Sequence, residues 1–100
     1  AAARRVGLAA PAPPKGPFDY VIVGAGSAGC LLANRLSRDP KTRVLLVEAG
    51  GHDRHMWIHI PVGYLYTMYD PKMSWGFETT AQPGLNGKSI GYPRGRVLGG

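Results

Sequence analysis

Cysteine and acidic side chains are scarce in this chain. Its 100 residues include one cysteine and six aspartates and glutamates, against twelve lysines and arginines. A lone Cys30 cannot form an internal disulfide, so a disulfide-held fold is excluded within these residues, and the redox compartment stays open. Long apolar runs are missing as well. None reaches the roughly 18 residues that cross a bilayer, so the sequence predicts no transmembrane segment.

The excess of positive charge, +6 at neutral pH, does not form a nucleic-acid footprint. Half of it comes from Arg4, Arg5 and Lys15, in a stretch with no acidic residue before Asp19. The other basic residues are spread among acids, with no basic stripe interleaved with aromatic residues. A basic terminal stretch beside an ordinary surface explains the charge, and we expect no nucleic-acid partner.

Residues 1–17 are predicted to form an arm rather than part of a core. They consist mainly of Ala, Pro, Gly and Arg, which cannot bury enough apolar surface to fold. The richness in Ala and Arg and the lack of acid are typical of the end of an organelle transit peptide, which points to a mitochondrion or plastid. A plain linker, or residues left by processing, explains the same composition.

The chain is long enough for one small domain at most, and residues 18–100 are predicted to be part of an α/β domain. Hydrophobic residues make up 44% of the whole sequence and charged residues 18%, which is typical of globular rather than disordered chains. The fifteen glycines and nine prolines fall mainly in the arm and the second half. We therefore expect loop-rich structure in the second half.

Residues 18–48 have the pattern of a strand, a glycine turn, a helix and a second strand. The run 18–23 is short, apolar and β-branched, like a strand buried on both faces. A helix is predicted from about Ser27 to just before Asp39-Pro40, because proline disfavours helix in the preceding residue. The second strand is predicted over Thr42–Val47. The helix residues spaced to form one apolar face are Ala28, Leu31, Leu32 and Leu36.

The glycine turn in this pattern predicts a dinucleotide site. Gly24 allows a tight turn, Gly26 allows a pyrophosphate to approach closely, and Gly29 lets the helix pack on the strand. The helix N-terminus at Ser27 directs free N–H groups and a partial positive charge at the phosphates. Glu48, at the end of the second strand, can accept both ribose hydroxyls. The contacts predicted here are Gly24, Gly26, Ser27, Ala28, Gly29, Glu48 and Ala49.

Two other interpretations of this turn stay open. A glycine-rich turn occurs in ordinary strand–helix–strand units that bind no ligand. An NAD-dependent dehydrogenase fits the fingerprint as well as any other dinucleotide enzyme does. The spacing of 19 residues from Gly29 to Glu48 is close to the expected spacing of about 20 and favours a dinucleotide of some kind.

In the second half of the chain the signals are shorter. A short helix after Pro61 fits the pattern, as do a strand over Trp75–Thr80 and a returning strand over Ser89–Tyr92. Asn86-Gly87 between these strands is a strong hairpin signal. No third parallel strand is evident, and a two-stranded parallel pair is a poor independent unit. We therefore expect an incomplete sheet that needs further polypeptide or a partner to cover it.

The other chemistry-bearing residues favour structural roles. His52, His55 and His59 are spaced three and four apart, but a glycine and a proline flank them and no further ligand completes a metal site. Cys30 is interpreted as a packing residue rather than a reactive thiol. Arg94 fits phosphate contact and a structural role equally well. We predict neither a metal ligand nor a catalytic residue in this chain.

Four segments of the chain form a recognisable set. In order they are Tyr20–Gly29, Leu45–Gly50, Trp75–Thr79 and Tyr92–Gly100. Together they resemble the N-terminus of the glucose–methanol–choline (GMC) oxidoreductases, and within that family the choline dehydrogenase-like members. The glycine fingerprint and the Pro-Arg-Gly-Arg-Val-Leu-Gly-Gly element are far more specific jointly than alone.

The resemblance implies FAD as the cofactor and a particular α/β fold. This is the N-terminal part of a Rossmann-like FAD-binding domain, in which a strand–helix–strand unit precedes a loop-rich segment with a hairpin. Gly24, Gly26, Gly29 and Glu48 would bind the ADP half of FAD. Residues 96–100 would begin the family's first signature, a loop beside the diphosphate and flavin. Its predicted cofactor contacts are Arg96, Gly99 and Gly100.

The resemblance also limits the expected activity. In this family an alcohol carbon gives a hydride to FAD while a base takes the hydroxyl proton. The sequence ends inside the first signature, so residues 18–100 are expected to be a partial domain, inactive without the remainder of the enzyme, which binds the small alcohol substrate. The alternative interpretation is a truncated, non-catalytic structural subunit of a larger, organellar assembly.

Overall fold

The computed structural model describes residues 14–100, which form two compact units. The first contains residues 14–53 together with 97–100, and the second contains Arg54–Arg96. Most of the predicted arm, residues 1–13, lies outside the described residues, and residues 14–17 contain no helix or strand. The boundary at residue 17 and the targeting role of the arm stay predictions.

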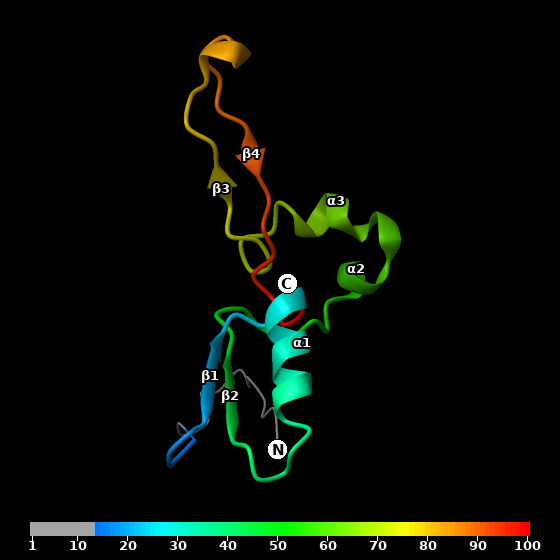
Figure 1. Cartoon of the computed structure of the whole chain (residues 1–100). Helices are drawn as coiled ribbons and strands as arrows, with labels where there is room; N and C mark the ends of the chain where they lie inside the picture. The colour runs from blue at the N-terminus through cyan, green and yellow to red at the C-terminus, as the bar shows by residue number, and fades with distance from the viewer. Residues whose placement is uncertain (1–13) are drawn as a thin grey trace. The chain divides into compact units, whose positions relative to one another are not determined.

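The first unit contains a strand, a helix and a second, parallel strand (Figure 1). β1 (Tyr20–Val23) pairs with β2 (Val44–Val47) along its whole length. α1 (Ser27–Leu36) connects the two strands. The predicted strand–helix–strand element is confirmed, although both strands begin two residues later than the sequence pattern suggested.

The helix packs through small residues and not through the apolar face predicted for it. Gly29 and Ala33 are buried, whereas Leu31 and Leu32 are 55% and 51% exposed. A Cβ atom on Gly29 would lie 1.9 Å from the carbonyl oxygen of Gly24, so the helix and the turn touch at this point. Two strands offer too narrow a surface to cover the leucines in addition.

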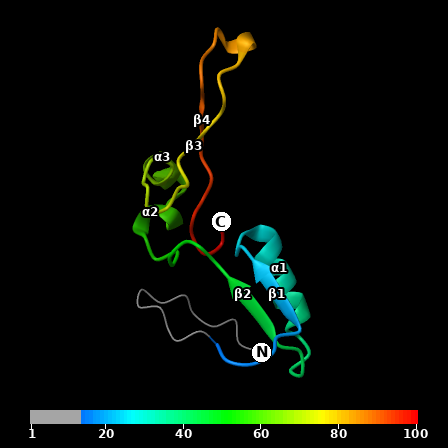
Figure 2. The ribbon, with the colours of Figure 1, turned by 90° about the vertical axis from the view of Figure 1, so that its left-hand side faces the viewer.

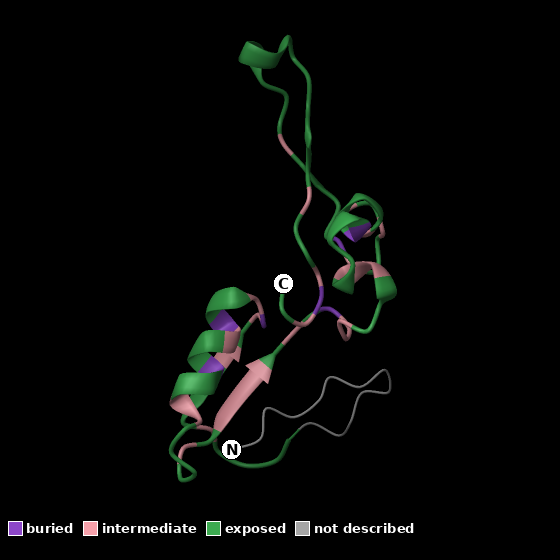
Figure 3. Cartoon of the chain, turned by 90° about the vertical axis from the view of Figure 1, so that its right-hand side faces the viewer, coloured by how far each residue is buried: buried purple, intermediate pink, exposed green. Residues whose placement is uncertain are grey.

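The core of the first unit is small, and buried residues are few (Figure 3). Its buried apolar residues are Ala25, Ala33 and Val97, and no large side chain is fully buried in residues 14–100. In β1, Val21 and Val23 are 59% and 84% exposed. The sequence pattern predicted a strand buried on both faces. The described residues do not bury both faces of β1, and they leave apolar surface for further polypeptide to cover.

Arg43 contacts the residues that precede β1. Its backbone N–H donates to Asp19 Oδ2 at 2.7 Å, and its guanidinium donates to the carbonyl of Lys15 at 2.9 Å. The same guanidinium lies over the ring of Phe18, 4.9 Å from its centroid. These contacts fix the path by which the described chain enters the sheet.

The first half of the second unit is a cluster of one-turn helices. α2 (Met56–His59) is followed by η1 (Pro61–Gly63), which continues into α3 (Tyr64–Thr67), so the helix predicted after Pro61 is confirmed. The rings of Trp57 and Tyr66 stack with centroids 4.4 Å apart and connect α2 with α3. Throughout the part of the chain that is described, no helix is long and apolar enough to cross a membrane.

The second half of this unit is a hairpin, and Figures 1 and 2 both show its two arms running side by side. β3 (Phe77–Glu78) pairs antiparallel with β4 (Gly91–Tyr92), and η2 (Pro83–Leu85) precedes the turn. Asn86 and Gly87 both have positive φ, 53° and 73°, and they lie in a loop of residues 83–87 that the bridge between Gln82 and Lys88 closes. The predicted hairpin is confirmed, with shorter strands than expected.

Gly63 offers a test of the packing in the second unit. A Cβ atom there would lie 1.8 Å from the carbonyl oxygen of Trp57, so Gly63→Ala must displace α2 from η1. We expect the free energy of unfolding to fall by about 1–3 kcal/mol, as in other overpacked sites. Urea unfolding followed by tryptophan fluorescence measures the change. In the matched control Gly84→Ala the new Cβ meets no atom within 4 Å, and an equal urea midpoint for the two variants contradicts the prediction.

Candidate cofactor site

Three segments of the first unit meet at one place: the glycine turn after β1, residues 48–51 after β2, and residues 97–100. Gly51 and Val97 form a parallel bridge, and the N–H of Leu98 donates to the carbonyl of Gly51 at 2.9 Å. The N–H of Gly99 donates to the carbonyl of Ala25 at 2.7 Å. Backbone hydrogen bonds thus bring together segments that are far apart in the sequence.

The glycine turn is built on conformations and distances that need glycine. Gly24 has a φ of +97°, which side-chain-bearing residues rarely adopt, and its N–H donates to the carbonyl of Val47 at 2.7 Å. Gly29 touches the turn, as described above. At Gly26 the position of a Cβ has no atom within 4 Å, although the backbone there is unstrained. The space beside Gly26 is therefore open to a ligand.

The N-terminus of α1 lies directly after this open space. Gly26 is the residue before the helix, and neither a side-chain cap nor an acidic residue occupies the first turn. The first backbone N–H groups of a helix have no acceptor within the helix, and they carry partial positive charge. Ser27 and Ala28 are exposed, so the N–H groups here suit an anion such as a pyrophosphate.

The carboxylate of Glu48 lies on the other side of the turn and is half-buried. Its Oε2 accepts the N–H of Ala25 at 2.7 Å, and its Oε1 accepts the N–H of Gly50 at 2.8 Å. Each carboxylate oxygen can accept a second hydrogen bond, so both remain able to accept a ribose hydroxyl. The adjacent Ala49 is exposed.

Residues 97–100 form a tight turn against the glycine turn. The N–H of Gly100 donates to the carbonyl of Val97 at 2.8 Å, and Gly99 and Gly100 have φ values of +104° and +88°. A Cβ atom on Gly100 would lie 3.1 Å from the Cα of Gly26. The two glycine turns therefore touch through their backbones, and a side chain on Gly100 would crowd Gly26.

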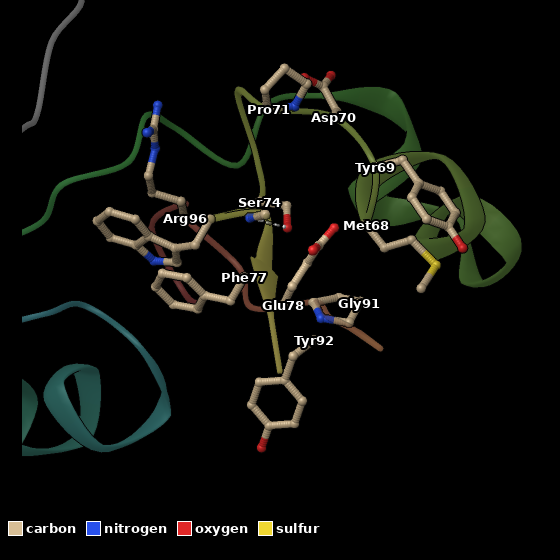
Figure 4. A pocket seen from close by; sticks show the side chains of 13 residues that line it. Met68, Tyr69, Asp70, Pro71, Ser74, Phe77, Glu78, Gly91, Tyr92 and Arg96 are labelled. Carbon is tan, nitrogen blue, oxygen red and sulfur yellow. Dashed lines mark hydrogen bonds between the residues drawn. The ribbon is translucent and has the colours of Figure 1, made fainter. Parts of the chain in front are cut away.

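Arg96, by contrast, belongs to the second unit. Its N–H donates to the carbonyl of Met73 at 2.8 Å, its guanidinium lies 5.4 Å from the centroid of the Trp75 ring, and its Nε is buried without a hydrogen-bond partner. It lines a pocket of about 410 Å³ with Phe77 and Tyr92 (Figure 4). All the predicted contacts except Arg96 lie in the first unit, and the role of each in cofactor binding stays a prediction.

Sequence reasoning missed Ala25, which is fully buried. Its N–H donates to Glu48, while its carbonyl accepts both the N–H of Gly99 and, at 3.1 Å, the thiol of Cys30. Ala25 acts through its backbone alone, so its side chain gave no signal. Gly51 was missed for the same reason, because its carbonyl and its bridge to Val97 join the segments.

The histidines do not form a metal centre in the structure. No group of three or more His, Cys, Asp or Glu residues within 14–100 is placed to bind a metal ion. His55 instead accepts the N–H of Trp57 through Nδ1 at 3.3 Å, which caps α2.

A protein-family model matches part of the chain. Residues 19–61 match the model described as lycopene cyclase protein. That range contains β1, α1 and β2 with the glycine turn, and it leaves most of the second unit unmatched. The match therefore reflects the strand–glycine turn–helix element.

Curated proteins match over much more of the chain. The alcohol dehydrogenase (acceptor) of Pseudomonas putida is 53% identical over 83 residues, which are 83% of this chain and 15% of that protein. The mitochondrial choline dehydrogenase of Mus musculus is 46% identical over 93 residues, covering 86% of this chain and 16% of that protein. The chain thus spans about 15% of the length of the curated relatives it matches.

Solved structures agree with these relatives. Pyridoxine 4-oxidase from Mesorbium loti superposes with a TM-score of 0.78 at 43% identity, over 83% of this chain and 16% of that one.

Among the curated proteins, a GMC-type oxidoreductase of Mycobacterium bovis is 45% identical over 82% of this chain and 15% of that protein, and its name gives the family. The chain belongs to the GMC oxidoreductase family and corresponds to the N-terminal part of its members.

Proposed function

We propose that this chain binds the ADP half of FAD in a flavin-dependent alcohol dehydrogenase or oxidase. The observation that carries the proposal is the meeting of three elements: an open glycine turn at Gly26, the carboxylate of Glu48, and the backbone of Gly100 against Gly26. The geometry suits a dinucleotide, and the family membership selects FAD over NAD.

The residues present fit this cofactor. The N–H groups at the start of α1 would bind the pyrophosphate, and Glu48 would orient the ribose through its hydroxyls. Gly99 and Gly100 would line the diphosphate with backbone alone. FAD, when bound, supplies the hydride acceptor. We assign to no residue of this chain the role of the base that takes the hydroxyl proton of the alcohol. That base would belong to the remainder of the enzyme.

The substrate is proposed to be a small alcohol. The names of the matched proteins include alcohol, choline and pyridoxine, each with a hydroxyl-bearing carbon that can give a hydride. We propose a choline-like substrate because the chain resembles the choline dehydrogenase-like members of the family most. The substrate site would lie in the remainder of the enzyme, since the chain spans about 15% of these relatives.

The same remainder is the proposed partner of the described residues. The exposed Val23 of β1 and the exposed Leu31 and Leu32 of α1 offer apolar surface on both strand and helix. Further strands and helices of a Rossmann-like domain would cover this surface. The proposal of a mitochondrial or plastid location rests on the arm, since the matched relatives are mitochondrial and bacterial.

A flavin titration tests the proposal. FAD is added to the 100-residue chain and, separately, to the chain extended to the length of its relatives, and flavin fluorescence is followed. NAD⁺ is added to the same proteins, and its binding is measured by calorimetry. We expect the extended protein to bind FAD and to leave added NAD⁺ unbound. If the extended protein binds no flavin, the proposal is wrong. In that case, binding of NAD⁺ would favour an NAD-dependent enzyme, and binding of neither cofactor would favour a non-catalytic subunit.

Gly26→Ala separates cofactor binding from folding. The new Cβ meets no atom within 4 Å and the backbone there is unstrained, so the fold should tolerate it. The methyl group would occupy the space proposed for the pyrophosphate, and we expect FAD affinity to fall about tenfold or more, equivalent to at least about 1.4 kcal/mol.

The matched control is Gly91→Ala in β4, where a new Cβ also meets no atom within 4 Å. It should bind FAD like the unaltered protein. Circular dichroism monitors the fold of both variants. Unchanged affinity in a correctly folded Gly26→Ala protein contradicts the placement of the pyrophosphate.

A further inference from the structure

Both oxygens of the Glu48 carboxylate already accept backbone hydrogen bonds. The bond from the N–H of Ala25, 2.7 Å long, crosses from the end of β2 to the middle of the glycine turn. The bond from the N–H of Gly50, 2.8 Å long, fixes the carboxylate itself. Building on the proposed FAD site, we propose that Glu48 is a positioning residue for the pyrophosphate part of that site, in addition to its role toward the ribose.

The turn depends on such a bond because glycines stand on both sides of Ala25. Glycine has more backbone freedom than any other residue, so neither Gly24 nor Gly26 restricts the peptide between them. A hydrogen bond to an ionised carboxylate is roughly twice as strong as one between neutral groups. The bond to Glu48 therefore fixes the orientation of the peptide that joins Gly24 to Ala25.

The remaining atoms around this peptide agree with a single orientation. The carbonyl oxygen of Gly24 lies against Gly29, where a Cβ would approach within 1.9 Å. The carbonyl of Ala25, at the other end of the residue, accepts from Gly99 at 2.7 Å and from the thiol of Cys30 at 3.1 Å. The N–H of Ala25 and the carbonyl of Gly24 share one peptide plane, so rotation of this N–H away from Glu48 would also move the Gly24 carbonyl from its place against Gly29.

The hydrogen bond between Ala25 and Glu48 also determines which backbone N–H groups are free to bind an anion. Because the N–H of Ala25 points at Glu48, it is not a phosphate donor, and the donors are the first N–H groups of α1. Without the bond to Glu48 the peptide before Ala25 is no longer fixed, and the turn that precedes α1 can take other orientations. Loss of the bond should therefore weaken binding of a pyrophosphate even when the ligand has no ribose hydroxyls.

The first experiment measures amide hydrogen exchange in the unliganded protein, extended as in the flavin titration. Glu48→Gln keeps the side-chain volume but has a single acceptor oxygen for the two N–H groups. Glu48→Asp keeps the charge on a shorter side chain and serves if the first variant does not fold. We expect the Ala25 amide to exchange about tenfold faster in either variant, equivalent to about 1.4 kcal/mol. Unchanged exchange at Ala25 in a folded variant overturns the proposal.

The second experiment compares ADP with 2′,3′-dideoxy-ADP, which keeps the pyrophosphate and lacks both ribose hydroxyls. If Glu48 acted through the ribose alone, Glu48→Gln would leave the affinity for dideoxy-ADP unchanged, and that result would overturn the proposal. We expect affinity for dideoxy-ADP to fall at least about threefold, with a larger loss for ADP. The control Glu78→Gln makes the same chemical change at an exposed position of β3 and should alter neither affinity.

The outcome separates this inference from the proposed function. If the unaltered protein binds neither FAD nor ADP, the proposed function fails, while the exchange of Ala25 still tests the positioning bond without any ligand. If it binds both and Glu48→Gln affects ADP alone, the proposed function stands and the positioning role is wrong.

Discussion

The hydrogen bonds of the Ala25 backbone determine the geometry of the first unit. The N–H of this residue is bonded to the carboxylate at the end of β2, and its carbonyl is bonded to residues 97–100 and to α1. Three stretches of chain therefore converge on a residue that is completely buried. A buried peptide group with unmet hydrogen bonds costs free energy. All partners of the Ala25 backbone must therefore be in place at the same time, which fixes their positions jointly.

This arrangement explains why the candidate site consists of backbone and small residues. A polar site built from long side chains loses side-chain entropy when they are ordered, whereas N–H groups at the start of α1 are fixed by the helix itself. Glycine at 24, 29, 99 and 100 is needed either for a positive φ or for close contact. Gly26 differs, because nothing in the described residues occupies the space next to it. The proposed pyrophosphate would explain the need for glycine at this position.

The parts of the fold that the sequence predicted are those with local signals. Hydrophobic runs marked β1 and β2, and Asn86-Gly87 marked the hairpin. The helix ends at Leu36, somewhat before the limit predicted at Asp39-Pro40. The apolar face predicted on α1 is largely exposed, because apolar spacing shows where leucines lie but not which surface the chain supplies to cover them. The link through Ala25 and Gly51 was not predictable, since both act through backbone atoms. The placement of Arg96 in the second unit likewise depends on contacts with Met73 and Trp75 that no local pattern encodes.

The buried residues of the first unit and the candidate site occupy the same region. Ala25 and Val97 are two of its three buried apolar residues, and both belong to segments that meet at the glycine turn. So small a core contributes little hydrophobic free energy, and a ligand that binds only the folded form adds stability in proportion to its concentration and affinity. In the proposed function, binding of a dinucleotide and folding of this unit would therefore be coupled by the same hydrogen bonds. A loss of affinity in a variant of this region is evidence about the site only when folding is measured in the same protein.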